Sequence, residues 1–69
     1  MSQSSNRTRK PSPEDQAFTR ALIERLGISQ ASKVLDLSRL ATQNVALGGD
    51  CYAITLAHVS ARRLSLSAA

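Results

Sequence analysis

Apolar residues recur at helical spacing in separate segments along the first part of the chain, and residues typical of helix ends lie between these segments. In the first segment, three apolar residues lie four positions apart on one helix face: Phe18, Leu22 and Leu26. Ser12 and Pro13 before them favour a helix start, and Gly27 after them favours a left-handed helix cap. The pattern predicts a helix over residues 13–26 that buries this stripe and has its two acids in the dipole-favoured first turn.

Three further helices are predicted after this one. Each follows a residue that favours the N-cap position: Ser29, Ser38 or Asp50. The predicted helices cover residues 30–36, residues 39–47, and residues 51 to 64 or 66. Gly48 is expected to end the third helix, because glycine readily adopts the left-handed conformation of a helix C-cap.

The apolar residues are mostly alanine and leucine, and no segment alternates polar and apolar residues for long. Both features favour helix over strand. The predicted fold class is therefore all-α, a small bundle of four or five helices. Residues 12–66 are expected to form its single domain. Residues 1–11, which have no apolar side chain after Met1, are expected to form a disordered, flexible basic arm.

The chain has 69 residues, with one cysteine and one histidine. One cysteine makes no internal disulfide, and one Cys with one His is too few for the roughly four ligands of a structural zinc site. We therefore expect no metal and no cofactor. So small a chain needs regular helices or self-association for stability. No apolar run approaches the roughly 18 residues of a membrane span, and a cytoplasmic protein is expected.

The formal net charge is +4, from nine cations and five acids. Arg7, Arg9 and Lys10 lie in the predicted arm, and all five acids follow it. The rest of the chain therefore has six cations against five acids and is nearly neutral. This charge favours an anionic partner and concentrates the bulk attraction in the arm.

Residues 28–48 carry the most informative pattern. Two helices of about two turns each, joined by three or four residues, must cross steeply. Ala31 and Ser32 are small where the two helices come close, and Leu37 can fill the core beneath the turn. Val45 is expected to face inward on the second helix of the pair.

This segment resembles the helix-turn-helix of bacterial and phage repressors of the Cro/repressor type. The resemblance is carried by an early Gln30, small residues within the first helix, the pair Leu37-Ser38 after the turn, and a closing Gly48. Two residues depart from the pattern. Asp36 stands at the turn, where the family usually has glycine, although Asp tolerates the left-handed conformation. Thr42 replaces a branched apolar residue.

The resemblance implies that the helix over residues 39–47 enters the DNA major groove. Its base-reading residues would be Ser38, Arg39, Gln43 and Asn44. The DNA backbone would be contacted by Ser29, Gln30 and Lys33, and from the arm by Arg7, Arg9 and Lys10. Two alternatives remain open here. Arg39 could instead balance Asp36 on the surface, and the arm could be a solubility tail rather than a groove-binding segment.

No catalytic constellation is visible. Cys51 and His58 lie seven residues apart on the last predicted helix, roughly 10 Å along its axis, which excludes a hydrogen bond between them. We therefore predict that the protein is not an enzyme, and no small-molecule effector site is evident.

The last predicted helix has more apolar residues than one buried stripe requires. A surface helix of a small monomer keeps a polar back. The excess predicts a homodimer, with candidate contacts at Tyr52, Ile54 and Val59. The alternative is that this helix is central to the domain and buried on several sides.

These observations together predict a sequence-specific double-stranded DNA-binding regulator from a bacterium, plasmid or phage. It is expected to act as a repressor, binding an inverted-repeat operator as a homodimer in the nucleoid. Two rival hypotheses are a small helical protein-interaction module and an architectural DNA binder without sequence preference.

Overall fold

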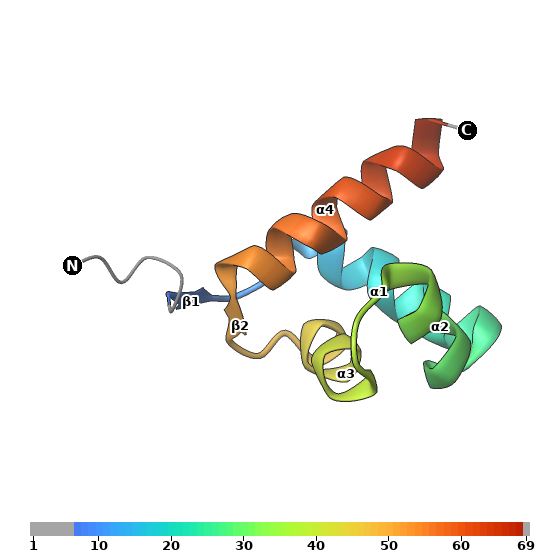
Figure 1. The fold of residues 1–69 in the computed structure, drawn as a ribbon, viewed down its shortest axis with the longest axis horizontal. Coiled ribbons are helices and arrows are strands. Elements are labelled where there is room, and N and C mark those ends of the chain that lie inside the picture. Colours follow the sequence, from blue (N-terminus) through green and yellow to red (C-terminus); the bar gives the residue numbers. More distant parts are fainter. Residues whose placement is uncertain (1–6, 69) are drawn as a thin grey trace.

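In the part of the chain that the structure describes, four helices and one short two-stranded sheet make up the fold (Figure 1). A computed structural model describes residues 7–68. The helices are α1 (Pro13–Leu26), α2 (Ile28–Leu35), α3 (Arg39–Leu47) and α4 (Ala53–Ala68), and the strands are β1 (Thr8–Arg9) and β2 (Cys51–Tyr52). The prediction of a small all-α bundle is confirmed, and the described part of the chain contains four helices rather than five.

The start of α1 is capped as predicted, whereas its junction with α2 is different. The Asp15 amide donates to Ser12 Oγ at 3.2 Å. Gly27 has φ 87° and ψ 159°, a conformation that favours glycine but is not the predicted left-handed cap. Its amide donates to the Ile23 carbonyl, and its carbonyl accepts from the Ala31 amide. One residue therefore ends α1 and starts α2.

The prediction that Ser29 caps the second helix is wrong, because α2 already begins at Ile28. That helix also ends one residue earlier than predicted. Asp36 lies outside it in the left-handed conformation, with φ 58° and ψ 44°. The turn to α3 thus forms with Asp where the repressor pattern has glycine. The predicted bounds of α3 are confirmed, and Gly48 ends it with φ 80°.

The predicted start of the last helix is wrong. Instead of lying in a helix capped by Asp50, β2 pairs antiparallel with β1, Thr8 facing Tyr52 and Arg9 facing Cys51. The Ala53 amide continues this pairing with a 3.0 Å hydrogen bond to the Arg7 carbonyl. Extended backbone needs partners for its N–H and C=O groups, and β1 supplies them.

The predicted disordered arm is therefore corrected in part. Residues 8 and 9 form a strand instead of a free tail, because β2 offers them backbone partners. Residues 1–6 of the predicted arm lie outside the described residues.

The main core lies where α3, β2 and α4 meet. It consists of Val45, Cys51, Leu56 and Val59, with Phe18 and Leu37 packed against it. The predicted small residues of α2, Ala31 and Ser32, are buried. The inward orientation predicted for Val45 is confirmed.

The face that α1 buries includes Phe18 and Leu22 of the predicted apolar stripe, but Leu26 is not part of it and polar residues are. Leu26 is 46% exposed, whereas Asp15 and Thr19 are buried. The Asp15 carboxylate accepts hydrogen bonds from Ser60 Oγ at 2.6 Å and from Arg63 Nε at 2.8 Å. Asp15 therefore does more than favour the helix dipole. It ties the first turn of α1 to α4.

The pKa of Asp15 results from opposing effects. Burial disfavours the charged carboxylate and raises the pKa, but the hydrogen bonds from Ser60 and Arg63 and the charge of Arg63 outweigh it. The net result is a pKa below the ordinary value for aspartic acid, so the carboxylate is ionised at neutral pH.

Candidate nucleic-acid interface

The outward face of α3 is the candidate interface. α3 packs against α1 and α2, and its residues Thr42 and Val45 are fully buried. Successive helix residues turn by about 100°, so Leu40, Gln43 and Leu47 lie on the opposite face. All three side chains are exposed, the leucines by 79% and 72%. The two leucines are not among the interface residues predicted from the sequence. The helical period that places Val45 on the inner face places them on the outer face.

Hydrogen bonds hold α3 in place at both ends. Ser38 Oγ accepts from the Ala41 amide at 3.0 Å, and the Gln16 side chain of α1 donates to the Ala46 carbonyl at 3.2 Å. Thr42 Oγ1 donates to the Ser38 carbonyl at 2.8 Å. That internal hydrogen bond satisfies the buried hydroxyl, and so threonine is accepted at a position where the repressor pattern has an apolar residue.

Two of the predicted base-reading residues, Arg39 and Gln43, have free polar groups. Both side chains are exposed, and no hydrogen bond or ion pair among the described residues engages either one. The alternative that Arg39 balances Asp36 through an ion pair is therefore not what the structure shows. Ser38 is also exposed, but its Oγ already accepts the helix-capping hydrogen bond.

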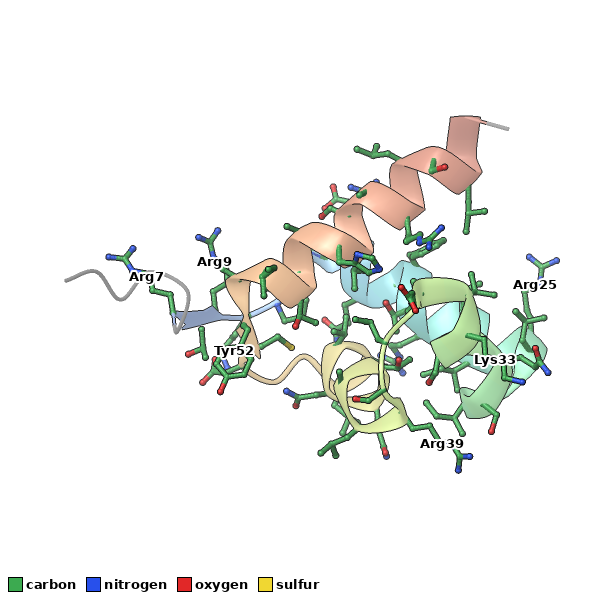
Figure 2. All side chains as sticks on the ribbon, in the orientation of Figure 1. Arg7, Arg9, Arg25, Lys33, Arg39 and Tyr52 are labelled. Atoms are coloured by element: carbon green, nitrogen blue, oxygen red, sulfur yellow. The ribbon has the colours of Figure 1, made fainter. Side chains whose placement is uncertain are left out.

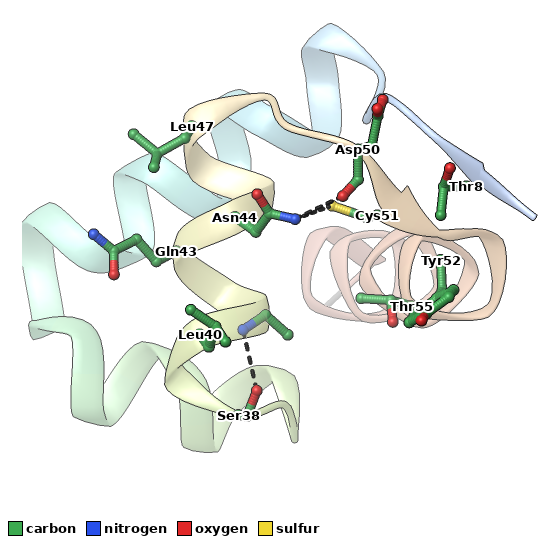
Figure 3. A pocket seen from close by; sticks show the side chains of 11 residues that line it. Thr8, Ser38, Leu40, Gln43, Asn44, Leu47, Asp50, Cys51, Tyr52 and Thr55 are labelled. Carbon is green, nitrogen blue, oxygen red and sulfur yellow. Dashed lines mark hydrogen bonds between the residues drawn. The ribbon is translucent and has the colours of Figure 1, made fainter. Parts of the chain in front are cut away.

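Asn44 does not lie beside Arg39 and Gln43, and the prediction that it faces outward with them is wrong. Its Nδ2 donates to the Asp50 carbonyl at 2.7 Å and lies 3.5 Å from Cys51 Sγ. Figure 3 shows Asn44 directed toward Cys51, whereas Gln43 points away from it. The Asn44 side chain lies on this side because the loop after α3 places the Asp50 carbonyl within hydrogen-bonding distance of its amide.

We expect Asn44→Ala to lower the free energy of unfolding by about 1 kcal/mol, because it removes the hydrogen bond to the loop carbonyl. Gln43→Ala is the matched control, with an expected change within about 0.5 kcal/mol, because Gln43 makes no contact of this kind. Urea unfolding followed by circular dichroism measures both values. Equal losses would show that the Asn44 amide does not hold the loop.

A groove of about 750 Å³ lies between α3 and the β2–α4 junction (Figure 3). Its apolar lining comes from Leu40 and Leu47 of α3 and from Tyr52 of β2. Gln43 and Asn44 contribute its amide groups. The outward face of α3 is thus a polar centre flanked by two apolar side chains, next to an open depression.

Cationic side chains lie at the end of the molecule where α2 packs. Figure 2 shows Lys33 and Arg25 at the same end as Arg39, and all three are exposed. Lys33 was predicted as a backbone contact, whereas Arg25 was not. Its position beside α2 depends on how the helices cross, and the local sequence around Arg25 carries no signal of that crossing.

Ser29 and Gln30 lie in the first turn of α2 and are exposed. The Ala31 amide bonds to Gly27, so the preceding amides of this turn have no partner within the helix. Ser29 does not act as a cap, and its hydroxyl and these amides are available to an anion.

The arm does not bring its cations to the outward face of α3. Neighbouring residues of a strand point to opposite sides, and it is Thr8 that lines the groove beside α3. Arg9 lines a second depression beside α4, and Figure 2 shows Arg7 and Arg9 at the far end of the molecule from Arg39. Lys10 lies 3.9 Å from Asp50 in an exposed ion pair, which contributes little stability.

The predicted dimer contacts divide into two kinds. Tyr52 and Ile54 are 54% and 74% exposed. Val59 is fully buried in the main core with Val45 and Leu56, so its prediction as an intermolecular contact is wrong. A helix pattern alone does not say which of two apolar faces meets the rest of the domain.

Cys51 is a core residue with a hydrogen-bonded thiol. Its Sγ donates to the Gly49 carbonyl at 3.3 Å. Burial, together with the nearby Asp50 carboxylate, raises the pKa of the Cys51 thiol, which disfavours the nucleophilic thiolate.

Within residues 7–68, no cluster of three or more His, Cys, Asp or Glu residues is arranged to hold a metal ion. No helix in that range is both long enough and apolar enough to cross a bilayer.

Comparisons of the chain with protein-family models, curated proteins and solved structures found no match. The functional interpretation therefore depends on the geometry of α2, the turn and α3, and on the side chains that α3 exposes.

Proposed function

We propose that this protein is a sequence-specific double-stranded DNA-binding regulator whose α3 enters the major groove. One observation carries the proposal. The α2–turn–α3 unit is anchored on its inner side and exposes Arg39 and Gln43 with free polar groups on its outer side. A rigid helix with uncommitted donors and acceptors is what direct readout of base edges requires.

The chemistry of these side chains suits base recognition. An arginine can donate two hydrogen bonds to guanine O6 and N7, and a glutamine can pair in the same way with adenine. Leu40 and Leu47 flank Gln43 and offer apolar contacts to thymine methyl groups. At nine residues, α3 is about 13 Å long, which suits contact with a few successive base pairs.

Phosphate contacts would position the helix. Lys33 and Arg25 lie at the α2 end of the molecule near Arg39, and the unpaired amides of the first turn of α2 attract anions. Arg7, Arg9 and Lys10 would add nonspecific attraction from the far end of the molecule. Binding without chemistry would repress transcription by occluding a promoter in the nucleoid.

Selection of bound sites from random DNA tests this function. We expect an enriched motif that the protein prefers over random duplex by about 10³-fold or more at near-physiological salt. Equal affinity for both would exclude a sequence-specific regulator and favour the architectural alternative. No binding to either would exclude DNA as the partner.

The exposed leucines favour a second candidate function, a protein-interaction module. Leu40 and Leu47 border the groove of about 750 Å³, and exposed apolar residues beside a groove are typical of protein contacts. The DNA affinity of the unsubstituted protein distinguishes the two functions, and Leu47→Asp tests whether the groove is the protein contact. If Leu47→Asp abolished binding to a partner protein and the unsubstituted protein had no DNA affinity, the protein would be a protein-interaction module.

A further inference from the structure

The side of α4 that faces away from the domain is uniformly uncharged. Four of its residues, at spacings of three, four and three, form the α4 stripe: Ile54, Ala57, Ala61 and Leu64. All four are exposed, Ile54 by 74% and Leu64 by 60%. Neither of the two charged residues of α4 lies on this stripe. Arg63 turns inward to Asp15, and Arg62 lies on the helix flank.

Packing within a single chain does not explain why the α4 stripe is apolar. The face of α4 that meets the domain is supplied by Leu56 and Val59, so the stripe is a second apolar face on the same helix. The helices of a small soluble monomer keep a polar back. Few large apolar side chains are buried in the described part of the chain. Seven large apolar residues there are exposed: Leu26, Leu40, Leu47, Tyr52, Ile54, Leu64 and Leu66.

We propose that the α4 stripe binds a second copy of this chain, with the two α4 helices crossing in an antiparallel two-fold contact centred on Ala57 and Ala61. This inference does not depend on the proposed DNA binding. It replaces Val59, which is in the core, with residues that are free to make an intermolecular contact.

The order of residues in the stripe is the reason for choosing a second copy as the partner. From either end, the stripe has the same spacings and the same sequence of sizes: large, small, small, large. An antiparallel two-fold axis therefore places Ile54 opposite Leu64 of the second copy, and Ala57 opposite Ala61. Alanines at the crossing allow the helix axes to approach to about 8 Å, and the larger side chains fill the diverging ends.

The charges agree with this partner and orientation. The four stripe residues carry no charge, and their own copy is equally uncharged. Arg9 and Lys10 line a depression beside Ala57, so the nearest cations flank one edge of the stripe and are not part of it. In an antiparallel pair the two Arg62 residues lie six residues apart along the axes, about 9 Å, whereas a parallel pair would bring them to the same level. Antiparallel helices also oppose their macrodipoles.

The size of the contact sets the expected affinity. From Ile54 to Leu64 the stripe is about 15 Å long, so the interface belongs with the smallest specific ones. We therefore expect a dissociation constant in the micromolar range. Figure 1 shows α4 along one side of the molecule, with its C-terminal end projecting away from the other helices.

Sedimentation equilibrium without DNA, over about 1 to 1,000 µM protein, tests the contact. The full chain is expected to form dimers, and Ala61→Glu to weaken their association by about tenfold or more, because a charge is buried at the crossing. Arg20→Ala is the matched control. It lowers the net charge by the same one unit at an exposed position of α1 outside both proposed interfaces, and it should leave dimerisation unchanged.

Ile54→Asp is a second variant at an exposed position, in case Ala61→Glu perturbs the helix, and circular dichroism checks that each variant is folded. A full chain that stays monomeric over the whole range would overturn the proposal. So would a loss of dimers in Arg20→Ala but not in the two α4 variants. Because no DNA is present, failure of this contact and failure of DNA binding are separate results.

Disulfide trapping tests the orientation. Differently tagged Ala57→Cys and Ala61→Cys chains, mixed and oxidised, should cross-link to each other, because these positions face one another. Ala57→Cys alone should cross-link poorly, since its two copies are offset by four residues, about 6 Å along the axes. Efficient cross-linking of Ala57→Cys with itself would show a parallel pair and overturn the antiparallel arrangement.

Discussion

Asp15→Ala is expected to lower the free energy of unfolding by about 3 kcal/mol. The Asp15 side chain is only 5% exposed and accepts hydrogen bonds from Ser60 at 2.6 Å and from Arg63 at 2.8 Å. Removing one member of a buried ion pair costs about 3–5 kcal/mol, because the other charge is left without its partner. Arg63 retains 28% exposure, so water partly compensates and the lower end of that range applies.

Glu14→Ala is the matched control for this prediction. Glu14 is the neighbouring carboxylate in the same first turn of α1, but it is exposed. Its loss removes only a helix-dipole interaction, and we expect a change of about 0.5 kcal/mol. Urea unfolding at pH 7 compares the two variants. Similar losses would show that the buried contact between α1 and α4 contributes little to stability.

The same contact has a defined pH dependence. Because the pKa of Asp15 is lower in the folded chain than in the unfolded one, its contribution is fully present above the unfolded pKa of about 3.9. The contribution is lost as the pH falls through the lower, folded pKa. The difference in stability between the parent chain and Asp15→Asn should therefore narrow below about pH 4.

Helix ends could be predicted from the sequence where the residues at the end decide the structure. Ser12 and Ser38 cap α1 and α3, and Gly48 ends α3, because each uses its own side chain or backbone freedom within one turn. The same local chemistry explains how Asp36 supports the turn between α2 and α3 without glycine. Residues that are close in sequence therefore sufficed for the turn and for both ends of α3, but not for the start of α2.

Features that depend on distant residues could not be predicted in this way. β1 and β2 have two residues each, too few for a periodic signal, and their partners lie more than forty positions apart. The burial of Asp15 depends on Arg63, 48 positions away. The orientation of Asn44 depends on the Asp50 carbonyl, whose position follows from the β-pairing that the sequence does not reveal.

For α4, the sequence predicts one feature correctly and another wrongly. The excess of apolar residues is present, but Val59, predicted as a dimer contact, lies on the face that packs into the core. Two faces of α4 are apolar, one containing Val59 and Leu56 and the other containing Ile54 and Ala57. The choice between them depends on how α4 packs against the domain, which is not encoded in the period of the helix itself.

The double substitution Arg39→Ala and Gln43→Ala is expected to have the largest effect on the proposed function. Each side chain can form a bidentate contact worth about 1–3 kcal/mol of discrimination between bases. Together their loss should reduce the preference for the selected site over random duplex by about 30-fold to 10⁴-fold. Neither residue makes a hydrogen bond or ion pair in the described part of the chain, so stability should change little.

Arg25→Ala and Arg62→Ala provide the controls, because each also removes one exposed arginine. If Arg25 contacts phosphate, its loss should weaken binding to all sequences alike and reduce the salt slope by about one. Because Arg62 lies on the flank of α4, Arg62→Ala should change neither the preference for the selected site nor the salt dependence of binding. Competition binding at several salt concentrations measures all of these variants. If the double variant kept its preference for the selected site, α3 would not be the reading helix.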